Sequence, residues 1–396
     1  MASIVDVELM PVAIHGDSSG ECDGTVDTLV VRLVDENGLA GIGECDAPPT
    51  VAKAFIEMPS AHIWSLNPID ILKGRDPLEV TAIWQDIYDG TLYPGRRGLG
   101  IHALSAIDIA LHDLAARQID QPVYKLMGGA RRPYNTPYAT VFPGMPQGRS
   151  MDALMQIIGS RFARAVELGF RAVKLELMFD DLVDDDRLID TIREARKMLG
   201  DDIRLLLDFA YRWRDWQDAR RVLNRVASCD IFLAEATLQH DDLHGHARLS
   251  DHTDVRIGGG EFAATRWELR EWIETAKVSV LQPDINRCGG LTEIRRIADM
   301  AELYGVQVVP HGWKTGITSA CGQHFQASTL NAPHVEYISP HLFDSPLRRD
   351  LAPFDLQIED GRVRLPEGPG LGAVLNDECV ERYMVKNMVK NMVKIA

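Results

Sequence analysis

Hydrophobic and polar residues change their spacing along the chain, and the change divides it into segments with different predicted structures. Residues 4–14 and 28–44 alternate with a period of two, and the second stretch contains a Glu-Asn-Gly turn between two apolar runs. This pattern predicts β-strands and a hairpin. Helical spacing follows over residues 77–127 and is strongest at 99–118, where apolar residues recur three and four positions apart. We therefore predict an α+β domain over residues 1–128.

Two stretches of this first domain are rich in the residues that make turns. Gly, Ser and Asp crowd residues 16–24, and proline and small residues recur at 46–60. Both compositions favour loops over regular structure. We expect both stretches to be mobile loops.

Beyond residue 128, short apolar runs alternate regularly with amphipathic stretches of helix length. Strand, helix and strand in repeated order imply parallel pairing, and eight strands in about 220 residues suit a (β/α)8 barrel. An open doubly wound sheet is the alternative, but the Gly-x-Gly-x-x-Gly turn typical of it is missing after the first strand. We predict a barrel over residues 129–353. Its strands are predicted at residues 134–141, 170–177, 203–209, 231–237, 255–262, 278–284, 306–312 and 334–339.

The end of the chain again has a residue pattern typical of β-strands. Residues 354–375 carry a Glu-Asp-Gly turn between two apolar runs, which predicts a second hairpin. We expect the segment 354–396 to return to the first domain, so that an α+β cap covers a modified TIM-type barrel. Residues 384–396 repeat Met-Val-Lys-Asn with a period of four, which favours a frayed or locally helical tail without function.

Composition excludes several classes of protein. The 396 residues carry a formal net charge of −16, whereas a nucleic-acid-binding surface needs clustered basic residues. No apolar run reaches the ~18 residues that a membrane-spanning helix requires, and Asp6 and Glu8 stand where a secretory signal would carry positive charge. Six scattered cysteines without a Cys-x-x-Cys pair indicate reduced thiols. We expect a cytoplasmic protein that binds neither nucleic acid nor a membrane.

Three acids close three consecutive predicted strands. Asp208, Glu235 and Glu261 end the runs Leu-Leu-Leu-Asp, Phe-Leu-Ala-Glu and Gly-Gly-Gly-Glu, and they lie 27 and 26 residues apart. In a parallel barrel the carboxyl ends of the strands open into one mouth. A single acid there is most often a solvated charge or a helix cap, but three converging carboxylates repel one another unless a cation neutralises them. Oxygen ligands alone favour Mg²⁺.

An acid and a histidine end the next two predicted strands. Asp284 and His311 lie 27 residues apart, so their side chains could be neighbours on adjacent strands. An aspartate bonded to one imidazole nitrogen fixes the tautomer and raises the basicity of the ring. His311 is therefore a candidate general base, and its alternative is a satisfied histidine of the barrel wall. Glu336 reaches the same mouth from the eighth strand.

Lys174 and Glu176 stand two residues apart on the second predicted barrel strand. Side chains at this spacing face the same side of a strand. Lys174 could bind a substrate carboxylate or, with a lowered pKa, move protons. The structural alternative is a simple ion pair between Lys174 and Glu176.

With these residues the chain resembles the enolase superfamily, and within it the mandelate racemase subgroup, over essentially its full length. The resemblance rests on the three acid-bearing runs and on further motifs at residues 103–129, 282–290, 310–316 and 366–372. It implies a capped barrel, bound Mg²⁺, a small carboxylate substrate, a homo-oligomer, and abstraction of the proton α to the carboxylate.

The resemblance also implies roles for individual residues. Cap loops near residues 16–27 and 46–58 would cover the site and select the substrate, and Lys314 and Glu176 would lie beside the substrate. The implied roles are Mg²⁺ ligands for Asp208, Glu235 and Glu261, a catalytic dyad for Asp284 and His311, and a hydrogen bond from Glu336 to the substrate carboxylate.

Two positions depart from the family pattern. Glu176 stands where much of the subgroup has the second lysine of Lys-x-Lys, and Ala210 stands where an asparagine is usual. Racemisation needs acid-base groups on both faces of the α-carbon, so the missing lysine favours elimination. We therefore predict a lyase that dehydrates an aldonate or aldarate to a 2-keto-3-deoxy acid. His311 is the predicted base, and Lys174 and Glu336 are predicted to hold the carboxylate.

Two alternatives stay open. A cycloisomerase, racemase or epimerase acting on a related carboxylate would use Lys174 as its second base, and would exchange the α-proton with D₂O without dehydration. A non-catalytic barrel, kept for binding or structure, would have lost metal ligands or the base, and the sequence keeps both.

Overall fold

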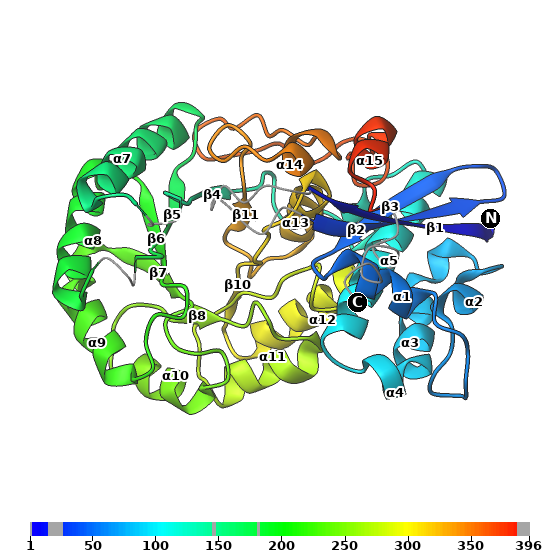
Figure 1. Cartoon of the computed structure of the whole chain (residues 1–396), viewed down its shortest axis with the longest axis horizontal. Helices are drawn as coiled ribbons and strands as arrows, with labels where there is room; N and C mark the ends of the chain where they lie inside the picture. Colours follow the sequence, from blue (N-terminus) through cyan, green and yellow to red (C-terminus); the bar gives the residue numbers. More distant parts are fainter. Residues whose placement is uncertain (1, 15–26, 145–147, 180–182, 386–396) are drawn as a thin grey trace, which may run out of the picture.

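Two units of regular structure lie side by side in the computed structural model, which describes residues 2–14, 27–144, 148–179 and 183–385. In Figure 1 a ring of helices surrounds a set of strands on one side, and a small sheet with further helices lies on the other. The unit with the ring of helices is a modified (β/α)8 barrel, and the unit with the small sheet is an α+β cap, as predicted.

An antiparallel sheet begins the cap. β2 and β3 form the predicted hairpin, and Gly38 in its turn has a φ of +79°, a left-handed conformation that glycine adopts at little cost. The strands are β1 (Ile4–Ala13), β2 (Asp27–Asp35) and β3 (Ala40–Cys45), paired in that order.

Helix α5 (Leu99–Gln118) packs directly on β3. It confirms the helix predicted from the spacing of apolar residues at 99–118. Gly43 makes this approach possible, because a Cβ on it would overlap the backbone of Ala106. Among the described residues, α5 is the one helix long and apolar enough to cross a membrane, and 89% of that apolar window is buried within the protein. A helix buried to this extent is a core helix of the cap.

One predicted loop of the cap is wrong. Residues 46–60 contain the helix α1 (Pro49–Ile56), which begins with a proline at its first turn and buries Ala52 and Ile56 against the cap core. Proline is favoured at that position because its missing N–H has no partner in a helix anyway. The other cap helices are α2 (Pro68–Leu72), α3 (Val80–Gly90), α4 (Leu92–Gly95), α6 (Val123–Leu126) and the short 3-10 turn Pro77–Glu79.

Eight parallel strands form the barrel within the described part of the chain. They pair as β11-β4-β5-β6-β7 and β8-β9-β10, and a parallel bridge from Ala234 to Ile257 links the two sheets. Each predicted strand is confirmed, although β8, β9 and β10 have only two residues each. The strands are β4 (Pro137–Val141), β5 (Ala172–Glu176), β6 (Arg204–Asp208), β7 (Ile231–Glu235), β8 (Gly258–Gly259), β9 (Val280–Leu281), β10 (Gln307–Val308) and β11 (Val335–Tyr337).

A helix follows each of the first seven described barrel strands, and these helices form the outer ring in Figure 1. Side-chain caps define several of their starts: Ser150 accepts from the N–H of Ala153, and Asp184 accepts from that of Arg187. The helices are α7 (Met151–Glu167), α8 (Asp185–Leu199), α9 (Trp216–Arg225), α10 (Leu243–Ser250), α11 (Thr265–Glu274), α12 (Gly290–Leu303) and α13 (Gly316–Ser328).

The C-terminal segment returns to the cap, as predicted. After α14 (Pro346–Asp350), the N–H of Leu371 donates to Asp113 of α5 at 2.8 Å. The chain continues through α15 (Asp377–Tyr383), and the N–H of Val385 then donates to Pro11 of β1. The return ties the last part of the chain to both the core helix and the first strand of the cap.

The second predicted hairpin is only partly present. A turn at Asp360 and Gly361 brings Glu359 and Arg362 into a single antiparallel bridge, without extended strands on either side. The predicted loop at 16–24 and the tail beyond 385 lie outside the described residues. The divisions of the chain at residues 128 and 353 stay predictions.

Candidate active site

The predicted acids lie at the carboxyl ends of neighbouring barrel strands. Register places Glu176 of β5 opposite Asp208 of β6, and Asp208 opposite Glu235 of β7. Glu261 follows two residues after β8. The carboxyl ends of parallel barrel strands open into one mouth, so these four carboxyl groups face it.

Lys174 is the buried cation of this mouth. Its Nζ lies 3.0 Å from both carboxylate oxygens of Glu235 and 2.9 Å from Glu336 Oε1. Burial alone lowers the pKa of an ammonium group, but Glu235 and Glu336 hold the pKa of Lys174 well above its ordinary value. Lys174 is thus a fixed positive charge, and its shift is opposite to the lowered pKa that proton transfer by a lysine requires.

Glu336 has its oxygens fully engaged. Oε1 accepts from the hydroxyl of Thr140 at 2.5 Å, and Oε2 accepts from the N–H of Gly312 at 2.8 Å. Burial raises the pKa of this carboxyl, but the charges of Lys174 and His311 lower it to about 2. Glu336 is therefore ionised and accepts hydrogen bonds in this structure.

His311 and Asp284 make the contact that their spacing predicts. The N–H of His311 Nδ1 donates to Asp284 Oδ2 at 2.6 Å, and the other oxygen of Asp284 accepts from the N–H of Asn286. His311 Nε2 points the other way and lies 3.9 Å from Glu261 Oε2. Burial lowers the pKa of His311, but Glu261 and the bond to Asp284 raise it to about 10.

Two of the predicted metal ligands are oriented by the turn after β6. The N–H of Ala210 donates to Asp208 Oδ1 at 2.9 Å, and the hydroxyl of Tyr211 donates to Glu261 Oε1 at 2.6 Å. Burial, followed by the charge of Glu261, raises the pKa of Tyr211 well above its ordinary value, so this phenol is a donor at any physiological pH. No pattern in the sequence indicates Tyr211 as a site residue.

Asp208, Glu235 and Glu261 fit Mg²⁺ in donor type, because all three carry carboxylate oxygens, and they lie at or just beyond the ends of neighbouring strands. Burial and Glu261 raise the pKa of Asp208 to about 6 despite Lys174, as expected for crowded carboxylates that a cation would neutralise. Among the described residues, no three His, Cys, Asp or Glu side chains converge closely enough to hold an ion as they stand. Glu235 is turned towards Lys174 instead.

Glu176 does not form the ion pair with Lys174 that was the structural alternative; among the described residues, Lys174 pairs with Asp208, Glu235 and Glu336. Burial and the neighbouring charge of Asp208 raise the pKa of Glu176 well above its ordinary value. The residue at the place of the second family lysine therefore brings a carboxyl group, not a second cation, to the mouth.

Lys314 lies where the cap meets the barrel. Its Nζ is 2.8 Å from Asp46 Oδ1 and donates to the backbone oxygen of Asp27 at 2.9 Å. Arg287, which follows β9, pairs with the same Asp46. Burial raises the pKa of Asp46, but Arg287 and Lys314 lower it to about 2. Asp46 and Arg287 were not predicted, because their contact depends on how the cap docks.

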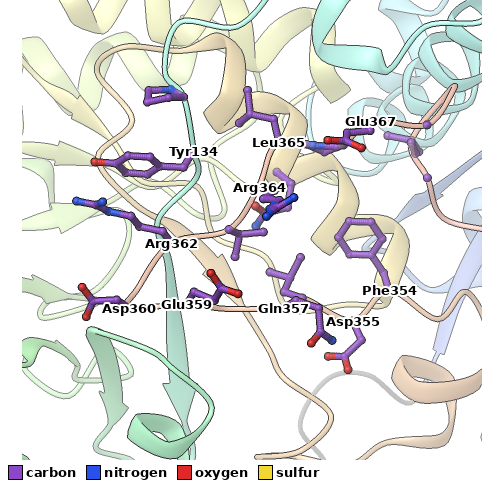
Figure 2. Close-up of a pocket in the computed structure, with 18 residues that line it drawn as sticks. Tyr134, Phe354, Asp355, Gln357, Glu359, Asp360, Arg362, Arg364, Leu365 and Glu367 are labelled. Atoms are coloured by element: carbon purple, nitrogen blue, oxygen red, sulfur yellow. The ribbon is translucent and has the colours of Figure 1, made fainter.

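A separate cavity of about 720 Å³ lies between the segment before β4 and the C-terminal return (Figure 2). In it Arg362 lies over the ring of Tyr134, with 4.2 Å from the guanidinium carbon to the ring centre. None of the nine predicted site residues is among the described residues that line it. The candidate active site is therefore the mouth and not this cavity.

A capped barrel with three acids, a His-Asp pair and a buried lysine at its strand ends is the arrangement of one enzyme class. Residues 4–128 match the family description "Mandelate racemase / muconate lactonizing enzyme, N-terminal domain", and residues 159–379 match "Enolase C-terminal domain-like". The chain belongs to the enolase superfamily of enzymes, in its mandelate racemase subgroup.

Individual relatives differ in their named reactions. The chain is 31% identical to the L-rhamnonate dehydratase of Saccharopolyspora erythraea over 89% of this chain and 84% of that one. It is 31% identical to the D-galactarolactone cycloisomerase of Agrobacterium fabrum over 90% of each. The structure of a racemase from Streptomyces coelicolor with bound magnesium superposes with a TM-score of 0.79 at 25% identity, over 96% of this chain and 100% of that one.

Proposed function

We propose that the protein is a Mg²⁺-dependent lyase that dehydrates a sugar acid, an aldonate or an aldarate, to a 2-keto-3-deoxy acid. The observation that carries the proposal is His311, bonded through Nδ1 to Asp284 and with Nε2 3.9 Å from Glu261. In the metal-free protein the charge of Glu261 helps to raise the pKa of His311 to about 10. A cation bound to Glu261 would offset that charge and leave Nε2 unprotonated, which suits removal of a proton α to a carboxylate. Family membership and a dehydratase among the relatives support the reaction class.

The proposed metal ligands are Asp208, Glu235 and Glu261. Mg²⁺ bound there would supply positive charge to stabilise the negative charge that develops on the substrate carboxylate. Magnesium in a related racemase structure supports the choice of ion. Ligation by Glu235 would require its side chain to turn from Lys174.

The proton transfer steps need only one histidine. His311 Nε2 takes the α-proton, the electrons of that C–H bond form a C=C bond, and the C–O bond at the next carbon breaks. His311, now an imidazolium stabilised by Asp284, gives the proton to the departing hydroxide, which leaves as water. The enol that remains becomes the keto acid by tautomerisation.

Lys174 supports elimination over two-base chemistry. In the metal-free protein Glu235 and Glu336 raise its pKa, and a lysine that stays charged is suited to attract a substrate carboxylate and is poor at accepting protons. We also propose that Lys314 and Glu176 contact the substrate, because both lie at the rim or wall of the mouth. The predicted hydrogen bond from Glu336 to the substrate carboxylate stays a prediction, since an ionised Glu336 does not donate.

A cycloisomerase or epimerase is the second candidate, favoured by the cycloisomerase among the relatives. Such an enzyme would exchange the α-proton of its substrate without forming a keto acid. We further propose a homo-oligomer, as the family resemblance suggests, and a cytoplasmic location. The five described cysteines, all buried and unpaired, are consistent with a reducing compartment.

A substrate screen tests the proposal. Purified protein with Mg²⁺ is incubated with a panel of aldonic and aldaric acids, and keto-acid formation is followed with semicarbazide. We expect at least one acid to give a 2-keto-3-deoxy product, and EDTA to abolish turnover. Incorporation of deuterium at the α-carbon without keto-acid formation would favour the second candidate, and no reaction with any acid would contradict both.

A further inference from the structure

We infer that Tyr211 is a positioning residue of the metal site: its phenol fixes the carboxylate of Glu261 so that one oxygen remains free for the cation. The inference rests on the proposed function, because Glu261 is a proposed Mg²⁺ ligand. It goes beyond that function, because it assigns a role to a residue outside the motifs on which the family resemblance rests.

The two carboxylate oxygens of Glu261 have different neighbours. Oε1 accepts from the Tyr211 hydroxyl at 2.6 Å, while Oε2 lies 3.9 Å from His311 Nε2. The phenol therefore occupies the oxygen directed away from the base and holds the other towards the mouth. Hydrogen bonds of this kind orient a metal-ligating carboxylate before the ion binds.

Tyr211 is itself rigidly held. Its backbone lies in the left-handed region, at a φ of +60°, and its N–H donates to Ala236 just beyond β7 at 2.6 Å. Gln239 donates to its carbonyl oxygen at 2.6 Å, and its ring stacks on Phe262 with 5.3 Å between the ring centres. A strained backbone persists when its surroundings fix it, and such residues cluster at functional sites.

The residue before Tyr211 brings no side-chain donor to the site. Ala210, also left-handed at a φ of +48°, has a methyl group with no polar atom to offer. Its N–H still orients Asp208. With the phenol of Tyr211 on Glu261, two of the three proposed ligands have a donor from the turn after β6 that orients them.

The test is cation binding to the full-length Tyr211→Phe protein. Phenylalanine keeps the ring and its stacking on Phe262, and removes only the hydroxyl. We expect calorimetric titration with Mn²⁺ and with Mg²⁺ to show binding weakened about 10-fold or more, and the melting temperature of the metal-free protein to be unchanged. Tyr304→Phe is the matched control, because it removes a 2.6 Å phenol bond to Glu274 far from the mouth; its cation affinity should equal that of the wild type.

A second variant shows whether Tyr211 acts through Glu261. Glu261→Asp shortens the side chain and breaks the contact, so adding Tyr211→Phe to it should cause no further loss of affinity. If Tyr211→Phe alone lowers the melting temperature, the comparison of Glu261→Asp with the double variant still shows whether Tyr211 acts through Glu261. Losses that multiply in the double variant, or wild-type affinity in Tyr211→Phe, would overturn the inference. A wild-type protein that binds neither ion would instead contradict the metal-dependent proposed function.

Discussion

At the scale of single residues, the mouth depends on one buried ammonium group. Lys174 is 1% exposed and lies 3.0 Å from Glu235 and 2.9 Å from Glu336. Both carboxylates are buried as well. Removing one partner from such a group leaves charge without compensation in a poorly solvated site, which is strongly destabilising.

We predict that Lys174→Met lowers the free energy of unfolding of the metal-free protein by about 3–5 kcal/mol. Urea denaturation at neutral pH measures the change. Lys277→Met is the matched control: it removes an exposed pair with Asp251 at 3.0 Å, and exposed pairs contribute little. Equal small losses in the two variants would contradict a structural role for the buried lysine.

The same residues show how far single positions can be predicted. The contact between Asp284 and His311 follows from the sequence, because equal spacing places both at the ends of adjacent strands. The partners of Lys174 do not follow, because Glu235 and Glu336 stand two strands away from β5, one on each side, and sequence spacing does not show which side chains span that distance. The contact of Tyr211 with Glu261 could not be predicted from the sequence either, because it depends on a left-handed turn.

At the scale of elements, the cap depends on the close approach of α5 to β3. Gly41 and Gly43 face the helix backbone, and a Cβ on Gly43 would overlap the carbonyl oxygen of Ala106. Backbone atoms in the middle of a helix cannot move aside as a side chain can. The strand and helix can pack only with no side chain between them.

We predict that Gly43→Ala destabilises the protein by about 1–3 kcal/mol, the usual cost of overpacking a core. Thermal unfolding followed by circular dichroism measures the effect. Gly368→Ala is the matched control, because a Cβ there meets no atom within 4 Å and its φ is not positive. A Gly43→Ala protein as stable as this control would show that α5 lies further from β3 than described.

Elements were predictable where spacing decides them. The eight barrel strands and the cap hairpin follow from hydrophobic periodicity. The sequence does not predict helix α1, because proline is typical of a loop, whereas Pro49 begins a helix whose Ala52 and Ile56 are buried. Its burial is a tertiary effect, set by the cap core and invisible in local composition.

At the scale of the whole molecule, one histidine joins three parts of the chain. His324 on α13 accepts from the N–H of Tyr124 in the cap through Nδ1, and its Nε2–H donates to Leu371 of the C-terminal return. Only a neutral imidazole can make both bonds. Burial accordingly lowers the pKa of His324 to about 4 from an ordinary 6.5.

This shift predicts a loss of stability in acid. Between pH 6.5 and 4 the unfolded chain binds a proton at this histidine and the folded protein does not, so the stabilisation is full above pH 6.5 and declines as the pH falls towards 4. We expect His324→Gln to reduce the slope of unfolding free energy against pH by up to about 1.4 kcal/mol per pH unit in this range. Urea denaturation at several pH values measures it. Identical slopes in the variant and the wild type would contradict the prediction.

The central claim concerns the whole assembly of mouth, base and acids: that His311 removes the α-proton. Its most direct test is the rate at which an acid that the enzyme turns over loses its α-proton signal, followed by proton NMR in the wild type and in His311→Asn. The variant should slow α-proton loss by about 10²–10⁴-fold, the usual contribution of a general base, with its fold and Mg²⁺ affinity retained. Loss of the α-proton at the wild-type rate in His311→Asn would contradict the account.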